Sequence, residues 1–174
     1  MNTFFIIALP RSRTAWLANF LTNDESFCFH YGIWKYGVDG IRAKMLALPA
    51  KTIGSSDTAA MFYMDKIISV FPGAKIIAID RNIDDIISSL RRCGLDESPN
   101  IELMESTFSN AKKFADIIIV YDDINIMADQ IWEYVTRTEC DMDRLEMLKG
   151  MNIQITKETI QMIRNTVASL QGAV

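Results

Sequence analysis

The sequence predicts an α/β fold, in which a parallel sheet lies between two layers of helices. Short apolar runs such as 4–8 and 75–80 have the length of buried strands, and segments with helical spacing of apolar residues lie between them. Strands that alternate with helices along a chain form parallel sheets covered on both faces. The 174 residues, 49% of them hydrophobic, are sufficient for one core. We therefore expect a single domain over 1–174, with helices from 125–174 packing on it.

The order of the elements follows from this alternation. Strands are predicted at 4–8, 26–30, 52–56, 75–80 and 116–121. Helices are predicted at 14–21, 35–47, 58–69, 82–92 and 101–113, and helical segments end the chain near 125–136, 141–148 and 156–171. Ligands of such sheets bind beyond the carboxyl ends of the strands, so polar residues at those ends are the first candidates for function.

The loop after the first strand carries the clearest functional signal. Residues 9–17 read LPRSRTAWL, a strand end followed by a polar loop and a helix start. This arrangement directs backbone N–H groups and the positive end of a helix at one point, which is how proteins bind phosphate. Arg11 and Arg13 add cations, and Ser12 and Thr14 add hydroxyls, so we expect an anionic ligand. The alternative is a polar turn in which Ser12 or Thr14 caps the helix.

A second segment of this kind follows the strand 75–80. Arg81 and Asn82 come directly after the strand, and Asn82 can cap the next helix. That helix has an apolar stripe with i, i+3, i+4, i+7 spacing, formed by Ile83, Ile86, Ile87 and Leu90. Ser89 lies beside the stripe, where it could reach a ligand. A surface ion pair with a nearby aspartate is the alternative for Arg81, but two anion-binding segments at strand ends can meet in one cleft.

The two segments together resemble the nucleotide-binding motifs of the sulfotransferases that use 3′-phosphoadenosine 5′-phosphosulfate (PAPS). Residues 9–17 resemble the motif L-P-(R/K)-S-G-T-T-W-L, which binds the 5′-phosphosulfate. Residues 81–89 resemble the motif R-N-P-x-D-x-x-x-S, which binds the 3′-phosphate. Three positions depart from these motifs: Arg13 replaces a glycine, Ala15 a threonine and Ile83 a proline. Residues 117–124 more weakly resemble a strand end of the same family.

This resemblance implies a fold like that of the P-loop nucleoside triphosphate hydrolases. It implies transfer of a sulfuryl group from PAPS to a hydroxyl or amine of a small-molecule acceptor, with adenosine 3′,5′-bisphosphate as product and no metal. Short members of the family occur in bacteria and bacteriophages, and the length fits such a member. The cofactor-binding residues that it implies are Pro10, Arg11, Ser12, Arg13, Thr14, Ala15, Arg81 and Ser89.

Sulfuryl transfer requires cations at the leaving phosphate and a base for the proton of the acceptor. Arg11 suits the first role. His30, at the end of the predicted strand 26–30, and Asp57, just after the strand 52–56, are the candidates for the base. Family members carry a catalytic glutamate or histidine near these places, although His30 can equally be a structural histidine.

The aromatic residues that follow His30 have two interpretations. Tyr31, Trp34 and Tyr36 could line a cleft for the acceptor. We interpret them instead as a cluster that packs the second helix, because aromatic side chains bury large areas.

Two other functions remain open at this point. A P-loop kinase of nucleosides or nucleotides has the same plan of strand, loop and helix, but the Gly-Lys pair of G-x-x-x-x-G-K-(S/T) is absent from 9–17. A nucleotide-binding protein without catalysis is the second alternative, and the departures at Arg13 and Ala15 favour it.

Composition argues against several classes of partner. The net charge of −4 argues against a nucleic-acid-binding protein. The longest apolar runs are too short to span a membrane, and no basic segment of a signal peptide precedes the first strand. Cys28, Cys93 and Cys140 lack metal-binding spacing and suit packing thiols of a cytoplasmic protein.

Overall fold

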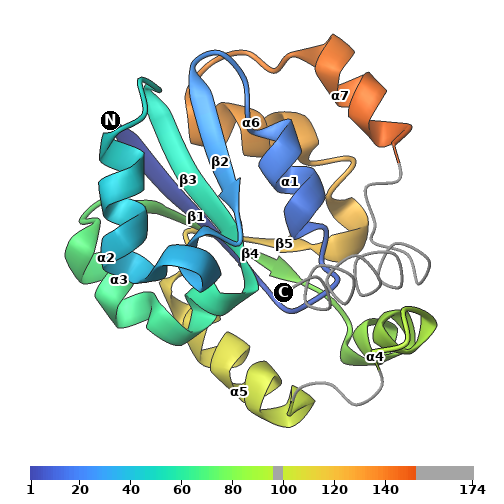
Figure 1. The fold of residues 1–174 in the computed structure, drawn as a ribbon. Helices are drawn as coiled ribbons and strands as arrows, with labels where there is room; N and C mark the ends of the chain where they lie inside the picture. Colours follow the sequence, from blue (N-terminus) through green and yellow to red (C-terminus); the bar gives the residue numbers. More distant parts are fainter. Residues whose placement is uncertain (96–99, 152–174) are drawn as a thin grey trace, which may run out of the picture.

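A five-stranded parallel sheet forms the centre of the computed structural model, which describes residues 1–95 and 100–151 (Figure 1). Its strands are β1 (Asn2–Ala8), β2 (Ser26–His30), β3 (Thr52–Asp57), β4 (Lys75–Asp80) and β5 (Ile117–Val120). They lie in the order β2-β3-β1-β4-β5, and each neighbouring pair is parallel. The predicted α/β fold is therefore confirmed.

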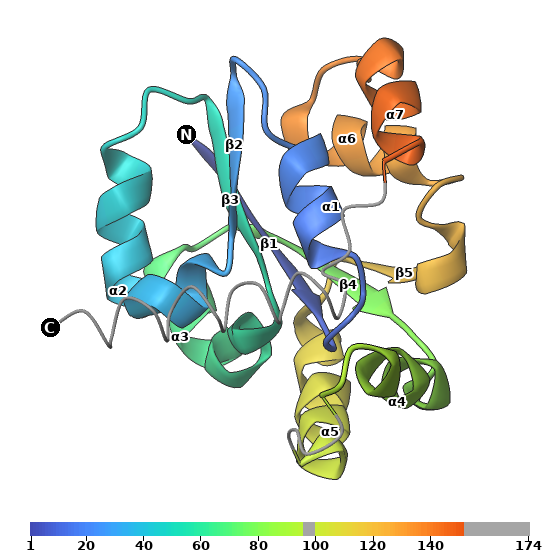
Figure 2. The ribbon, with the colours of Figure 1, turned by 45° about the vertical axis from the view of Figure 1, so that its right-hand side comes forward.

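Helices cover both faces of this sheet (Figure 2). The α-helices are α1 (Thr14–Phe20), α2 (Gly32–Leu46), α3 (Met64–Val70), α4 (Ile83–Arg92), α5 (Ile101–Ala111), α6 (Ala128–Thr136) and α7 (Met142–Lys149). Short 3-10 helices are η1 (Thr58–Tyr63), η2 (Lys112–Phe114) and η3 (Tyr121–Asp123). Helices α1, α6 and α7 pack on one face, and α2, α3 and α5 pack on the other.

The central strand β1 divides the core into two clusters. Phe4, Ile6 and Ala8 face the side of α1, whereas Phe5 and Ile7 face the side of α2. All of these side chains are fully buried, as expected for a parallel strand covered on both faces. Gly54 of β3 lies against this strand so closely that an added Cβ would be 2.4 Å from the carbonyl oxygen of Phe4.

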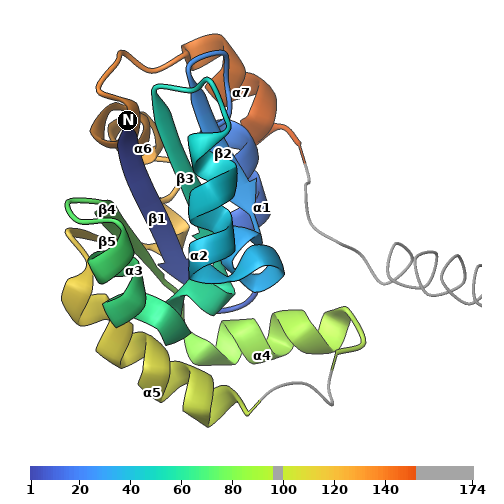
Figure 3. The same ribbon diagram turned by 60° about the vertical axis from the view of Figure 1, so that its left-hand side comes forward.

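The connections between the strands place the opening for a ligand at the carboxyl end of β1. The connection after β1 runs through α1 on one face, whereas those after β3 and β4 run through helices on the other face. A point where successive connections leave toward opposite faces is where α/β sheets bind ligands. Helix α4 lies at this same end of the sheet (Figure 3).

Several helices begin or end differently from the prediction. The helix expected at 35–47 is preceded by a helical turn that begins at Gly32, and α2 is broken at Gly37, whose φ of 64° and ψ of 177° are not helical. An added Cβ at Gly32 would be 2.8 Å from Phe29 Cβ, so only glycine fits there. The helix expected at 58–69 is divided into η1 and α3, because the carboxylate of Asp57 accepts the N–H of Ala59 and caps a tight first turn. The predicted helix 156–171 lies outside the described residues.

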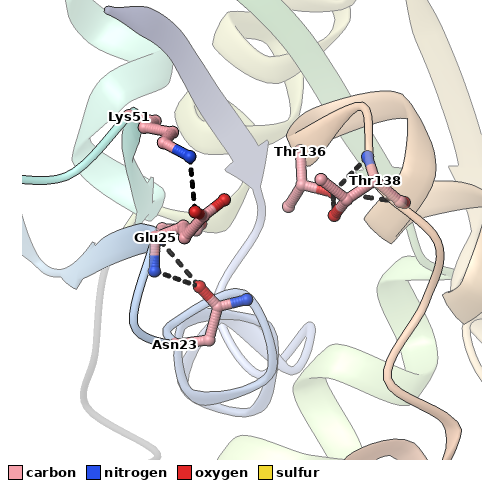
Figure 4. A network of polar contacts seen from close by, with 6 residues as sticks. Asn23, Glu25, Lys51, Thr136 and Thr138 are labelled. Atoms are coloured by element: carbon pink, nitrogen blue, oxygen red, sulfur yellow. Dashed lines mark hydrogen bonds and ion pairs between the residues drawn. The ribbon is translucent and has the colours of Figure 1, made fainter.

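Polar contacts hold the opposite, amino end of the sheet (Figure 4). The side chain of Asn23 accepts the N–H groups of Glu25 and Ser26 at 2.8 and 2.7 Å, and Lys51 pairs with Glu25 at 2.5 Å. Surface ion pairs contribute little stability, about 0–1 kcal/mol, so these contacts mainly fix the turn that leads into β2.

Two further predictions concern the cysteines and the membrane. Cys28, Cys93 and Cys140 are buried, as packing thiols should be. Burial raises the pKa of the Cys28 thiol, so this thiol stays protonated at neutral pH. In the described part of the chain, we find no helix with the length and hydropathy needed to cross a membrane.

Candidate active site

The loop between β1 and α1 has the backbone shape of an anion-binding nest. Arg11 and Arg13 both adopt left-handed backbone angles, with φ of 65° and 59°. Arg13 is followed directly by the helical Thr14, and alternation of this kind turns successive N–H groups toward one point. Among the described residues, no side chain caps α1 and the buried hydroxyl of Ser12 has no hydrogen-bond partner. The alternative of a simple capped turn is therefore wrong.

The structure brings the second anion-binding segment against this loop. Arg11 Nε donates a hydrogen bond to Ser89 Oγ at 3.1 Å, and Arg81 Nη1 donates to the carbonyl oxygen of Arg11. Ser89 is buried on α4, on the flank that its spacing predicted. The ends of β1 and β4 thus form one polar centre with two guanidiniums.

Arg81 is held by an aromatic side chain rather than by an aspartate. Its guanidinium lies 3.9 Å from the centre of the Tyr121 ring, and its buried Nε has no hydrogen-bond partner. The preceding Asp80 pairs instead with Lys112 at 2.8 Å. Among the described residues, Arg81 therefore does not form the surface ion pair with an aspartate that was the alternative. A buried donor without a partner costs stability unless a ligand or a water satisfies it.

The side chain of Arg13 packs on Trp16 and Asn125, and it also interacts electrostatically with Tyr121. Its guanidinium lies 4.3 Å from the Trp16 ring centre, and Nη1 donates to Asn125 Oδ1 at 2.7 Å. Trp16 itself is buried on the sheet and donates from Nε1 to the carbonyl oxygen of Leu148 at 2.9 Å. The side chain of Arg13 therefore joins α1 to the segment before α6, and its backbone contributes to the shape of the loop.

His30 lies beside the start of α1. Its Nε2 is 3.4 Å from Thr14 Oγ1, and its ring stacks on the Tyr31 ring with 3.8 Å between centres. His30 is exposed to solvent, and the partial burial of its ring lowers its pKa. The imidazole is therefore neutral at pH 7 and can accept a proton.

Asp57 lies one residue beyond the pairing of His30 with Ser56, at the end of β3. Its Oδ1 accepts the N–H of Ala59 at 2.8 Å, and its Oδ2 accepts the N–H of Trp34 at 3.0 Å. Burial raises the pKa of Asp57, although these backbone hydrogen bonds oppose the shift. Both carboxylate oxygens thus fix the starts of η1 and α2.

A cavity of about 500 Å³ adjoins these residues, and its wall extends from Pro10 and Asp57 to η1 and α5. Tyr31 and Trp34 line it and are exposed, so our interpretation of them as a packed cluster was wrong. Only Tyr36 packs as expected, with its ring against Phe29.

The sequence reasoning missed several residues of this site. In the cavity they are Phe62, Tyr63 and Met104. Tyr121 contacts Arg81, and Asn125 contacts Arg13. The sequence held a signal for Phe62 and Tyr63, because adjacent aromatic residues in a helical segment cannot both face the sheet.

Comparisons with known proteins were made for the whole chain. No family model matches it, and no curated protein matches it. Among solved structures, it is similar to the crystal structure of a sulfotransferase from Alicyclobacillus acidocaldarius, with a TM-score of 0.55 and 12% sequence identity. The similarity covers 97% of this chain and 92% of that chain. The chain has a sulfotransferase-like fold.

Proposed function

We propose that this protein is a sulfotransferase that moves a sulfuryl group from PAPS to a hydroxyl or amine of a small-molecule acceptor. One observation carries the proposal: Arg11 donates to Ser89 and accepts from Arg81, which joins two anion-binding segments from different strands. A nucleotide with phosphates on both its 5′ and 3′ positions requires two anion sites close together. A simple 5′-nucleotide requires only the first.

The residues present fit such a nucleotide. The hydroxyl of Ser12 and Nε of Arg81 are buried donors without partners, one in each segment. In the proposal, Arg11 and the backbone N–H groups of 11–15 hold the 5′ group, and Arg81 and Ser89 hold the 3′-phosphate. The local arginines supply the positive charge that a protein of net charge −4 lacks as a whole.

The cofactor supplies an activated sulfuryl group, whose bond to the 5′-phosphate oxygen breaks as the acceptor forms its bond to sulfur. Arg11 places a fixed positive charge where the leaving phosphate gains negative charge. His30 takes the proton of the acceptor, because its imidazole is neutral and partly exposed. Asp57, our other candidate, uses both oxygens to fix backbone N–H groups, so we assign it a positioning role.

Calorimetry tests the proposal with adenosine 3′,5′-bisphosphate, AMP and ATP, each with and without magnesium. We expect selective, magnesium-independent binding of the bisphosphate. Arg81→Ala and Ser89→Ala should each weaken that binding by roughly 10- to 100-fold, the effect of one or two charged hydrogen bonds, and should change AMP binding far less. Ser88→Ala and Arg91→Ala are matched controls, because both side chains are exposed on the same helix.

Each other result has a distinct meaning. Equal losses for AMP and the bisphosphate would contradict the 3′-phosphate site. Preference for ATP with magnesium would favour a phosphotransferase. The protein could also bind the bisphosphate tightly and yet form none of it from PAPS with any acceptor. That result would favour a nucleotide-binding protein that has lost catalysis.

A further inference from the structure

Exposed aromatic side chains are concentrated around one cavity beside the loop. The cavity has a volume of about 500 Å³, and Pro10 of the loop forms part of its wall. Four exposed aromatic residues line it: Tyr31 (43% exposed), Trp34 (78%), Phe62 (47%) and Tyr63 (49%). Elsewhere in the described residues, Phe114 alone is an aromatic residue of comparable exposure. Because proteins normally cover such side chains, this concentration indicates a surface that a ligand covers.

The lining of the cavity limits the chemistry of that ligand. Among the described residues, Asp57 is the one charged residue of the lining, and this carboxylate is fully buried beneath the surface. None of the described lining residues is a cation, and Arg11, which interacts electrostatically with Tyr31, belongs to the polar centre. An anionic group held between the aromatic side chains would therefore lose its hydration without a cation among the lining residues. The hydroxyls of Tyr31, Thr58 and Tyr63 are few for the many hydroxyls of a sugar. A neutral, largely apolar ring system suits this surface.

The volume gives a second limit, because sites of about 300–1,000 Å³ are typical for ligands larger than a single ring. The position gives a third: the Tyr31 ring stacks on His30, so the cavity adjoins the proposed base as well as the loop. We propose that the acceptor is an uncharged aromatic alcohol of two or more rings, held between these side chains. This inference rests on the sulfotransferase function proposed above.

The step that this acceptor undergoes is balanced. Its hydroxyl oxygen forms a bond to sulfur, the bond between sulfur and the 5′-phosphate oxygen breaks, and the hydroxyl proton passes to His30. The products are an aryl sulfate ester and adenosine 3′,5′-bisphosphate.

Binding of 2-naphthol to the full-length chain, measured by calorimetry without nucleotide, tests the inference. Decahydro-2-naphthol has the same carbon skeleton without aromaticity, and 6-hydroxy-2-naphthoate adds a negative charge. We expect saturable binding of 2-naphthol and at least about five-fold weaker binding of either analogue. Phe62→Ala and Trp34→Ala should weaken 2-naphthol binding by a similar factor, and Phe114→Ala, the exposed aromatic outside the cavity, should not change it.

Equal binding of 2-naphthol and its saturated analogue, or equal effects of Phe62→Ala and Phe114→Ala, would overturn the inference. Circular dichroism checks that each variant is folded, which we expect because these side chains are exposed. A parallel titration with adenosine 3′,5′-bisphosphate separates the two proposals. If the bisphosphate fails to bind while 2-naphthol binds as expected, the sulfotransferase function fails and the aromatic site remains.

Discussion

Arg13 occupies the position at which the resembling family has glycine, and its replacement by glycine or alanine tests how the loop keeps its shape. The residue adopts a left-handed backbone with φ of 59°. Glycine adopts this conformation freely, whereas alanine has the same steric conflict as arginine. Both replacements remove the guanidinium. The two variants therefore differ mainly in backbone strain.

The structure gives the expected magnitudes. The contact of Arg13 with Trp16 at 4.3 Å is a cation–π pair worth about 0.5–1 kcal/mol at a partly exposed site. The hydrogen bond to Asn125 adds about 0.5–1.5 kcal/mol. Left-handed backbone costs a non-glycine residue about 1–2 kcal/mol. Arg13→Ala should therefore lower the free energy of unfolding by about 1–2.5 kcal/mol. Arg13→Gly regains the backbone strain, so its effect should lie between a gain of about 1 kcal/mol and a loss of about 1.5 kcal/mol.

Urea unfolding measures this difference, provided that the dependence on denaturant is the same for each variant. Asn125→Ala is the control for the hydrogen bond, and it should cost only that contribution. An Arg13→Ala variant as stable as Arg13→Gly would refute the reasoning. The glycine variant should also bind adenosine 3′,5′-bisphosphate within about two-fold of the wild type, and a ten-fold loss would mean that the guanidinium binds phosphate.

Three further predictions concern His30, Gly54 and Asp57. Burial lowers the pKa of His30 below about 6.5, so a rate–pH profile of sulfuryl transfer should decline only below that pH. His30→Gln should reduce the rate of transfer by about 10²–10⁴-fold. Gly54→Ala should lower the free energy of unfolding by about 1–3 kcal/mol in urea, because its Cβ would meet the backbone of Phe4. Burial raises the pKa of Asp57 above about 3.9, its value in the unfolded chain. The stability that its protonation contributes is therefore full below about pH 3.9 and is lost as pH rises through the raised pKa. Asp57→Asn should abolish this loss in urea unfolding series from about pH 4 to pH 8.

Three of the strands, at 4–8, 75–80 and 116–121, could be predicted because each contains a short apolar run, whereas the strand at 52–56 has mostly small and polar residues and followed from the alternation of strands with helices. The strands at 26–30 and 75–80 have the predicted bounds. Helix starts were harder, because tertiary contacts decide them. Gly32 lies against Phe29 and Ile41 with no room for a Cβ, and local periodicity does not record such a contact.

The polar centre could also be predicted, because carboxyl ends of parallel strands share one edge. That rule brings Arg11 and Arg81 together without knowledge of side-chain positions, and the helical spacing of 83–90 adds Ser89 on the flank of α4. The direction of the Arg13 side chain did not follow, since it depends on Asn125, which is distant in sequence. The aromatic cavity did not follow either, because the exposure of Trp34 depends on which neighbours fail to cover it.

The adjacent ends of β2 and β3 explain how two candidate bases acquire different roles. His30 pairs with Ser56, so Asp57 lies one residue further along and deeper, where the first turns of α2 and η1 converge. A carboxylate at that point satisfies N–H groups from both turns, and it cannot take up a proton from a ligand without weakening them. His30, on the edge strand, has a long contact with Thr14 and a ring contact with Tyr31, and it stays exposed to solvent. The sheet thus uses the buried acid to build the wall of the cavity, and it leaves the neutral imidazole beside the loop as the group that is free to exchange a proton.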